Sequence, residues 1–176
     1  PASALFVAGA EVDSKNFPAL TPLAFTQAEA QSSASLYPHA RLEAGGSVDS
    51  ASVVGALPTT ELFHFAGHAL FDDVRPERSR IVVRPRGVDA ATISALDLRR
   101  LRLVVLSACE SMRASERVGS GFSGLSDAFL AAGAGGVVGS PWRVSDAPTA
   151  ELMRAFHLSY SKSRGARTAL RDAQIS

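Results

Sequence analysis

The segment Leu101–Leu106 reads LRLVVL, and this almost unbroken apolar run is the feature that most constrains the fold. A strand with one solvent-exposed face alternates apolar and polar residues. A central strand of a parallel sheet is covered on both faces and is therefore apolar almost throughout. Leu62–Phe71 (LFHFAGHALF) predicts a second strand of this kind, followed by a turn. Because parallel strands need long crossover connections, the chain is expected to alternate strands with helices.

The rest of the sequence supplies this alternation. Thr21 and Pro22 suit the cap and first residue of a helix, Asp49 and Ser50 can cap another that Pro58 stops, and Gly133 can end a third. Further strands are expected at 4–10, 41–44, 80–83 and 136–139, and helices at 22–37, 49–57, 89–96, 122–130, 152–160 and 164–175. We therefore predict a three-layer α/β sandwich with a mostly parallel central sheet, which binds ligands beyond the carboxyl ends of its strands.

Composition limits the class of protein. The 176 residues are 46% hydrophobic, which predicts a single domain, 1–176, with a substantial core. A net charge of +1 argues against a general nucleic-acid or membrane binder, and no apolar run reaches the length of a membrane span. The first residues lack a basic start and an initiator Met, so we expect a cytoplasmic fragment of a longer multidomain chain, without a signal peptide.

Two further features of the composition concern possible partners and metal sites. Eight arginines lie between Arg75 and Arg102, and such a stretch either binds an acidic partner or, more often, is a solvated face. Cys109 is the single cysteine, which excludes an intramolecular disulfide and a multi-thiolate metal site and fits a reducing cytoplasm. We expect no metal and no cofactor.

His68 and Cys109 each follow one of the two central strands, 41 residues apart in the sequence. If those strands are neighbours, the two side chains meet at one edge of the sheet. A thiolate is a good nucleophile and an imidazole can activate it and return the proton, so the pair suffices for acyl transfer without an obligatory third group. The alternative is that Cys109 is a small buried hydrophobe and His68 an ordinary loop residue.

The same residues resemble a known family. Leu62–His68 (LFHFAGH) and Leu103–Glu110 (LVVLSACE) are similar to the two signatures of the CHAT domain, a group of caspase-like cysteine peptidases related more distantly to caspases, separase and gingipain. The resemblance continues through Gly124–Gly139 and Pro141–Asp146. It implies a caspase-like fold, with Cys109 as nucleophile and His68 as general acid and base.

The resemblance also implies an oxyanion hole formed by the backbone N–H groups of Cys109 and Ala69. The family usually has Gly at the position of Ala69, so either the turn differs or the hole is imperfect. Where the family often has Glu followed by Thr, Glu110 is followed here by Ser111, a small change.

The resemblance implies that the chain is a cysteine endopeptidase that acts on protein or peptide substrates. Helical-repeat or nucleotide-binding domains in the same chain or complex would control it, in prokaryotic defence or cell death. One alternative is a catalytically latent pseudo-peptidase that serves as a protein-interaction module. Another is a nucleotide or phosphate binder using Gly119–Gly124, which fits G-x-G-x-x-G but lacks a preceding strand.

Four residues are candidates for substrate binding. Ser107 stands two residues before Cys109, where metacaspases that cut after Arg or Lys carry an acid. Trp142 and Arg143 resemble the Trp-Arg pair that lines the caspase specificity pocket, and a guanidinium there would favour an acidic side chain. In the alternative, Arg143 faces solvent and pairs with Asp146, which leaves an apolar pocket that prefers Leu or Met.

The other histidines have structural interpretations. His64, four residues before His68 on a strand, lies too far below the edge to touch substrate and is expected to be a core histidine bonded to a neighbouring loop. His39 and His157 are expected at the surface.

Overall fold

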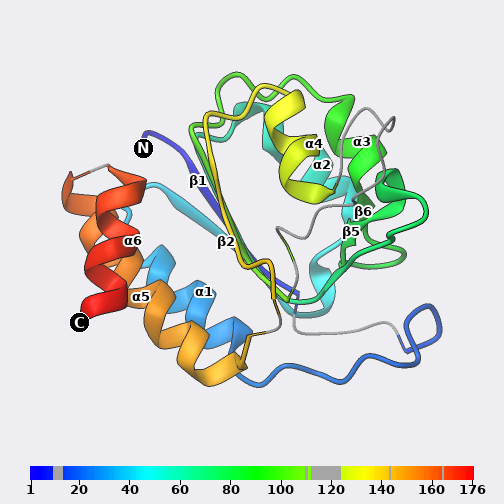
Figure 1. The fold of residues 1–176 in the computed structure, drawn as a ribbon, viewed down its shortest axis with the longest axis horizontal. Coiled ribbons are helices and arrows are strands. Elements are labelled where there is room, and N and C mark those ends of the chain that lie inside the picture. The colour runs from blue at the N-terminus through cyan, green and yellow to red at the C-terminus, as the bar shows by residue number, and fades with distance from the viewer. Residues whose placement is uncertain (10–13, 110, 112–123, 143, 164) are drawn as a thin grey trace.

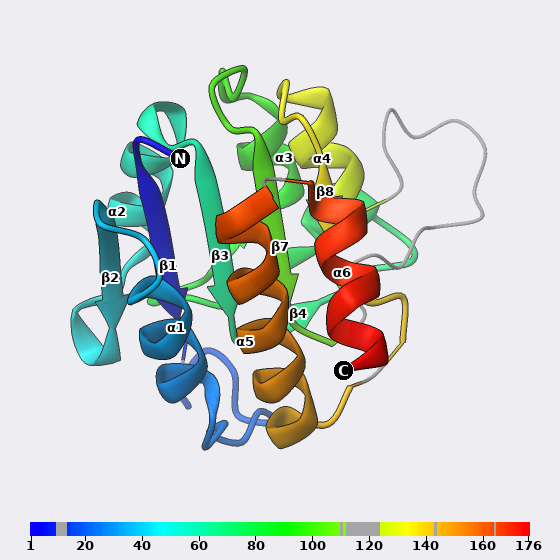
Figure 2. The same ribbon diagram turned by 90° about the vertical axis from the view of Figure 1, so that its left-hand side faces the viewer.

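The computed structural model describes residues 1–9, 14–109, 111, 124–142, 144–163 and 165–176. Within them, a five-stranded parallel sheet has the strand order β2-β1-β3-β7-β8. Its strands are β1 (Ala4–Ala8), β2 (Ala40–Ala44), β3 (Leu62–Ala66), β7 (Leu103–Ser107) and β8 (Val137–Val138). Helices α1 (Thr26–Ala34), α5 (Asp146–Ser163) and α6 (Ala166–Ile175) cover one face, while α2 (Ser50–Ala56), α3 (Ala90–Ser94) and α4 (Leu125–Ala131) cover the other (Figures 1 and 2). The predicted three-layer α/β sandwich with its mostly parallel sheet is confirmed.

The central strands contribute to two cores at once. In β7, Val104 and Leu106 belong to the core shared with α2, α3 and α4, whereas Leu103 and Val105 belong to the core shared with α1, α5 and α6. β3 divides in the same way, with Phe63 facing the first core. Successive side chains of a strand point to opposite faces, so burial on both faces requires the continuous apolar sequence.

Local signals set several element ends. Asp49 caps α2 by accepting a hydrogen bond from the Ser52 N–H at 2.7 Å. Gly133 follows α4 with φ +103°, a left-handed conformation that favours glycine, so its predicted role is confirmed. The first helix, however, begins at Thr26 rather than at Pro22. The segment before it is held in a non-helical path by contacts with the sheet edge that are described below.

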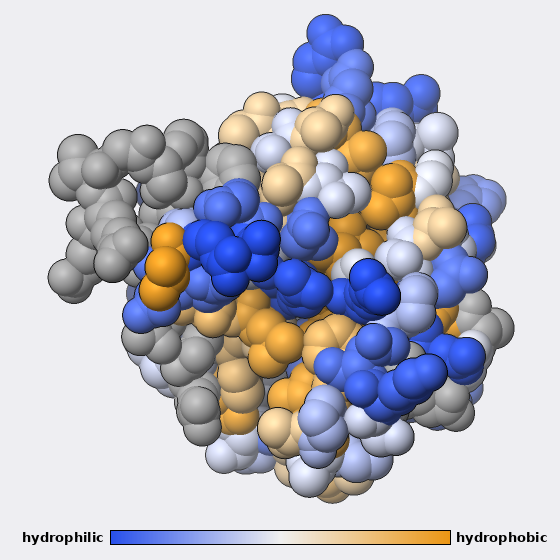
Figure 3. All heavy atoms as spheres, turned by 90° about the vertical axis from the view of Figure 1, so that its right-hand side faces the viewer, coloured by the Kyte–Doolittle hydropathy of each residue, from blue (hydrophilic) through white to orange (hydrophobic). Residues whose placement is uncertain are grey.

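A second, antiparallel sheet follows β3. It consists of β4 (Ala69–Leu70), β5 (Arg80–Ile81) and β6 (Val88–Asp89) in that order among the described residues. Hydrophilic side chains gather in a band across the face that carries β5 and β6 (Figure 3). Arg80 and Arg84 donate there to the carbonyls of Arg86 and Gly46.

The arginines between 75 and 102 are divided between two ends of the central sheet. Arg102 directly precedes β7 and lies near Glu61, whose pKa is lowered first by the Ala2 N–H and then by Arg102. Arg80, in contrast, lies in the sheet that continues from the carboxyl end of β3. The basic stretch of sequence therefore does not form one basic surface.

Two predictions fall on residues outside the described ranges. They concern the G-x-G-x-x-G stretch, of which residues 119–123 are not described, and the orientation of Arg143. None of the helices in the described part of the chain is both long and apolar enough to cross a membrane.

Candidate active site

His68 and Cys109 border the same cavity. β3 and β7 are parallel neighbours with Ala66 opposite Ser107, so His68 and Cys109 each stand two residues beyond a matched pair. The Gly67 N–H donates to the Ser107 carbonyl at 3.1 Å and continues the pairing past the strand ends. Both side chains line a cavity of about 70 Å³, which we call the dyad cavity. The strands are therefore neighbours, as the interpretation of the sequence required.

Gly67 is required by close packing beneath His68. A Cβ at this position would lie 2.7 Å from Cζ of Phe65 and 3.3 Å from Cα of Gly9. The core ring of Phe65 and the chain after β1 therefore leave no space for a larger residue. This packing carries the chain out of β3 with His68 directed to the edge of the sheet.

A backbone carbonyl fixes the His68 ring. The Nε2–H of His68 donates to the carbonyl of Thr21 at 2.7 Å. Because a carbonyl can only accept, this bond leaves Nδ1 as the ring atom that can take up a proton. The sequence interpretation required no third group and placed Thr21 at a helix cap. A main-chain carbonyl has no residue signature, so only the fold could reveal it.

Cys109 is a free, partly buried thiol. Its S–H donates to the carbonyl of Val144, with 3.6 Å between Sγ and the oxygen. Val144 lies between β8 and α5, so the thiol is in contact with the loop that also carries Trp142. Cys109 thus lines an accessible cavity and is not sealed in the core.

Ser111 anchors the chain that follows Cys109. Its side chain is 1% exposed, and its hydroxyl donates to the Leu106 carbonyl at 3.0 Å. The same oxygen accepts from the Ser140 N–H at 3.2 Å. One hydroxyl therefore ties the turn after Cys109 both to β7 and to the segment after β8. The replacement of the family's Thr by Ser keeps the chemical group that makes these bonds.

Replacing Ser111 with Ala should lower the free energy of unfolding by about 1–3 kcal/mol, because a partly buried N–H and a buried carbonyl lose their partner. Urea denaturation of the purified chain measures this change. The matched control is Ser94→Ala, whose hydroxyl bonds only a carbonyl of its own helix turn, and it should stay within about 0.5 kcal/mol. Equal stability of the two variants would show that the Ser111 bridge is dispensable.

Ala69 lies in a regular strand. The His68 carbonyl accepts from the Val82 N–H at 2.8 Å, and Ala69 pairs with Ile81 in the next register position. Hydrogen-bonded and non-bonded pairs alternate along an antiparallel ladder, so the Ala69 N–H points away from β5. Extended backbone is open to any residue, and Ala in place of the family's Gly therefore brings no steric penalty here.

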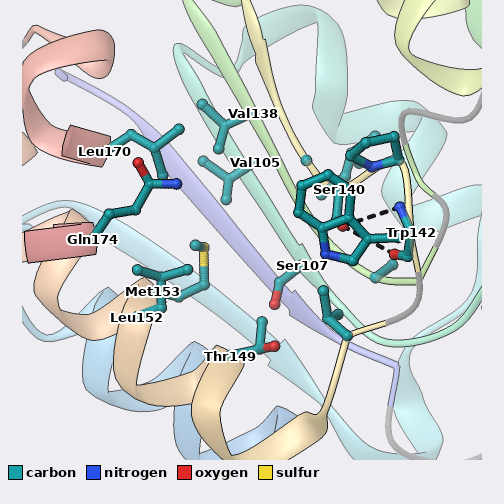
Figure 4. A pocket seen from close by; sticks show the side chains of 15 residues that line it. Val105, Ser107, Val138, Ser140, Trp142, Thr149, Leu152, Met153, Leu170 and Gln174 are labelled. Atoms are coloured by element: carbon teal, nitrogen blue, oxygen red, sulfur yellow. Dashed lines mark hydrogen bonds between the residues drawn. The ribbon is translucent and has the colours of Figure 1, made fainter.

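A larger pocket adjoins the dyad cavity. It has a volume of about 180 Å³, and the two cavities share Ser107, Ala108, Val144 and Thr149. We call it the apolar pocket, because its walls are mainly aliphatic (Figure 4). The walls are formed by Val105, Val138, Leu152, Met153 and Leu170, with Trp142 and Gln174 also among the lining residues.

The four predicted substrate-binding residues are not equivalent. Ser107 lines both cavities, while Trp142 lines the apolar pocket and is 67% exposed. Asp146 lines only the dyad cavity, and its Oδ2 accepts from the Phe25 N–H at 3.0 Å. This bond joins the start of α5 to the start of α1. Arg143 is outside the described residues.

A buried polar cluster lies behind the site and corrects two predictions. His157 is fully buried in α5 rather than at the surface, whereas His39 is exposed as expected. His64 is also fully buried, but its ring bonds His157 in a helix rather than a neighbouring loop, with 3.0 Å between Nδ1 of His64 and Nε2 of His157. Helical spacing carries the missed signal, since His157 falls four residues after Met153 on the apolar stripe of α5.

The cluster has a defined direction of hydrogen bonding. Burial, and secondarily Tyr160, raises the pKa of Tyr37 well above its usual range, so its hydroxyl remains a donor to Nδ1 of His157 at 2.9 Å. Burial, followed by the nearby His64, holds the pKa of His157 far below 6.5, so its ring is neutral and Nε2–H donates to His64. Nε2 of His64 then lies 3.1 Å from Oε1 of Glu29, outside hydrogen-bonding geometry.

Glu29 connects this cluster to the dyad cavity. Its carboxyl group is 2% exposed, yet Glu29 also lines the dyad cavity. Phe6 packs its ring against both histidine rings at centroid distances of 5.3 Å. Polar groups sealed in this way fix the relative positions of α1, α5 and β3. No group of three or more His, Cys, Asp or Glu side chains within the described ranges is arranged to hold a metal ion.

Comparison with known proteins agrees with the observed fold. A family model for the CHAT domain matches residues 1–176. Among solved structures, the Arg-specific cysteine proteinase gingipain R matches with a TM-score of 0.67 and 11% identity over 99% of this chain and 41% of that chain. The complex of the Porphyromonas gingivalis RgpB pro- and mature domains matches with a TM-score of 0.61 and 13% identity over 92% and 38%. No curated protein matches.

At these identities the likeness concerns the fold, which is that of caspase-like cysteine proteinases. The chain spans about two fifths of the length of the proteinase structures that it matches.

Proposed function

Because the chain belongs to the CHAT domain family, we propose that it is a cysteine endopeptidase in which Cys109 attacks the peptide carbonyl and His68 transfers the proton. The observation that supports this most directly is that a free thiol and an imidazole line one cavity at the ends of adjacent parallel strands. The bond from His68 to the Thr21 carbonyl leaves Nδ1 for proton transfer.

In the proposed reaction, the thiol proton of Cys109 moves to Nδ1 of His68 as Sγ bonds to the substrate carbonyl carbon. The Thr21 carbonyl stabilises the imidazolium that forms, because it accepts from Nε2–H throughout. When the C–N bond breaks, the ring gives its proton to the leaving amine. Water then adds to the thioester, its proton passes through His68, and the carboxylic acid leaves with the thiol restored.

The negative oxygen of the tetrahedral intermediate needs donors already in place. The N–H groups of Cys109 and Ala69 are proposed for this role. Ala69 suits it because its N–H points away from the β4–β5 ladder. No side chain is required, so Ala can do what Gly does in other members of the family.

One observation favours a second candidate, a catalytically latent module. The S–H of Cys109 is directed to the Val144 carbonyl rather than to His68. In this arrangement the S–H has to turn away from the Val144 carbonyl, which belongs to the loop after β8, before the proton can pass to the ring. We therefore propose that helical-repeat or nucleotide-binding domains of the same chain or complex control the site through this loop, in a defence or cell-death system.

The proposal is tested by trapping the nucleophile. Peptides that carry an acyloxymethyl ketone at the carboxyl end should form a thioether with Cys109, located by mass spectrometry after digestion. Cleavage of a protein or peptide library by the same preparation would establish the endopeptidase. Adduct formation without cleavage would favour the latent module, and absence of both would contradict the proposed function.

A further inference from the structure

The apolar pocket has the position of a specificity site for the proposed peptidase. Ser107 and Ala108, which directly precede Cys109, line both this pocket and the dyad cavity. Val144, whose carbonyl lies 3.6 Å from Sγ, also borders both. The residue whose carbonyl is attacked, here called the scissile residue, carries its side chain on the Cα next to that carbon. The side chain is therefore within reach of a pocket that adjoins the dyad cavity, as the apolar pocket does.

The chemistry of the walls selects the side chain. Val105 comes from β7, Val138 from β8, Met153 from α5 and Leu170 from α6, so apolar groups from four elements converge (Figure 4). Among the described residues that line the pocket, none carries a charge. Thr149, one of its few polar residues, already donates its hydroxyl to the Ser145 carbonyl at 2.6 Å. A charged side chain would lose its hydration here without gaining a partner.

From this geometry, and resting on the proposed function, we infer that the apolar pocket binds the scissile residue and that this residue is Leu or Met. A volume of about 180 Å³ accommodates either side chain. Both present only carbon, hydrogen or thioether sulfur to the aliphatic walls, and the unbranched Met side chain can adapt to an irregular shape. Ala would leave most of the pocket unfilled, and each missing methylene in such a site lowers the rate about 10–200-fold.

Gln174 offers a way to test the position of the pocket. It is an exposed residue of α6 whose amide reaches toward the aliphatic walls (Figure 4). Exchanging it for Glu changes one group and adds a carboxylate at the solvent side. If the scissile side chain lies in this pocket, a Lys there gains a partner that the wild type does not provide.

The experiment uses acyloxymethyl ketone peptides that are identical except for Leu, Met, Ala, Asp or Lys at the scissile position. The rate of Cys109 labelling is followed by intact mass. Leu and Met should react at least about 10-fold faster than Ala, Asp and Lys. Gln174→Glu should raise the rate for Lys relative to Leu several-fold. Gln31→Glu, the same change at an exposed position of α1, should leave the ratio unchanged.

Each other outcome has a definite meaning. Equal rates for all five peptides, or fastest labelling by Lys, would overturn the inference while supporting the proposed function. An Asp preference that is lost in Arg143→Ala would replace it with the acidic-specificity hypothesis. If Gln174→Glu and Gln31→Glu behave alike, the scissile side chain does not lie against α6. Absence of any adduct at Cys109 would contradict the proposed function itself.

Discussion

Replacing Cys109 with Ala should abolish peptide cleavage, and replacing His68 with Ala should lower its rate by at least about 100-fold, the usual contribution of a general acid and base. The two losses have different causes. Without Sγ no thioester can form, whereas without the ring the thiol has no neighbouring acceptor for its proton. Cleavage of a substrate selected from the peptide library, followed by chromatography, measures both rates.

His39→Ala is the matched control, because His39 is exposed and is not among the residues lining the dyad cavity. It should cleave at the wild-type rate. Cys109→Ala should change the free energy of unfolding by less than about 1 kcal/mol, since a single partly exposed sulfur is lost. Cleavage that survives in Cys109→Ala would place the nucleophile elsewhere. Equal rates of iodoacetamide labelling in the wild type and His68→Ala would remove His68 from the activation of the thiol.

The sequence predicts two parts of the fold well: the central strands, which are buried on both faces, and the helix ends that are marked by a single residue. Apart from His64 and Ser107, β3 and β7 are apolar because each strand contributes side chains to two cores. Asp49 and Gly133 mark helix ends by their own backbone preferences. The position of His68 and Cys109 at one edge followed from the same argument, because parallel strands end together.

What could not be predicted depends on contacts between distant segments. The Thr21 carbonyl reaches His68 across 47 residues, and Phe25 donates to Asp146 across 121. These two bonds hold the segment before α1 over the sheet edge, which is why the helix begins four residues later than Pro22 indicated. Backbone groups of this kind leave no pattern in the sequence.

His157 illustrates a different failure. Its position on the apolar stripe of α5 was readable, but a lone polar residue on such a stripe shows its partners only in three dimensions. Both nitrogens of His157 have partners, Tyr37 from the segment between α1 and β2 and His64 from the middle of β3. With both nitrogens bonded, the neutral His157 ring can be buried at little cost in free energy. Its burial makes the stability of the fold depend on pH.

The free energy of unfolding should fall as the pH is lowered below about 6.5, by up to about 1.4 kcal/mol per pH unit from His157 alone. In the folded chain, burial and the neighbouring His64 hold the pKa of His157 far below 6.5, so the ring stays neutral. In the unfolded chain the ring takes up a proton at its ordinary pKa. The unfolded state therefore binds more protons in this range, and acid favours it. Urea denaturation at pH 7, 6 and 5 measures the slope.

The contribution of His157 is isolated by His157→Gln. The Gln amide can accept from Tyr37 and donate to His64, but it does not titrate, so the loss of stability between pH 6.5 and 5 should become smaller. His39→Gln makes the same change at an exposed position and should retain the wild-type slope. If His157→Gln lost as much stability as the wild type over this range, His157 would have to carry its proton in the folded chain. Both ring nitrogens of His157 would then donate, so the Tyr37 hydroxyl would accept from Nδ1–H instead of donating to Nδ1.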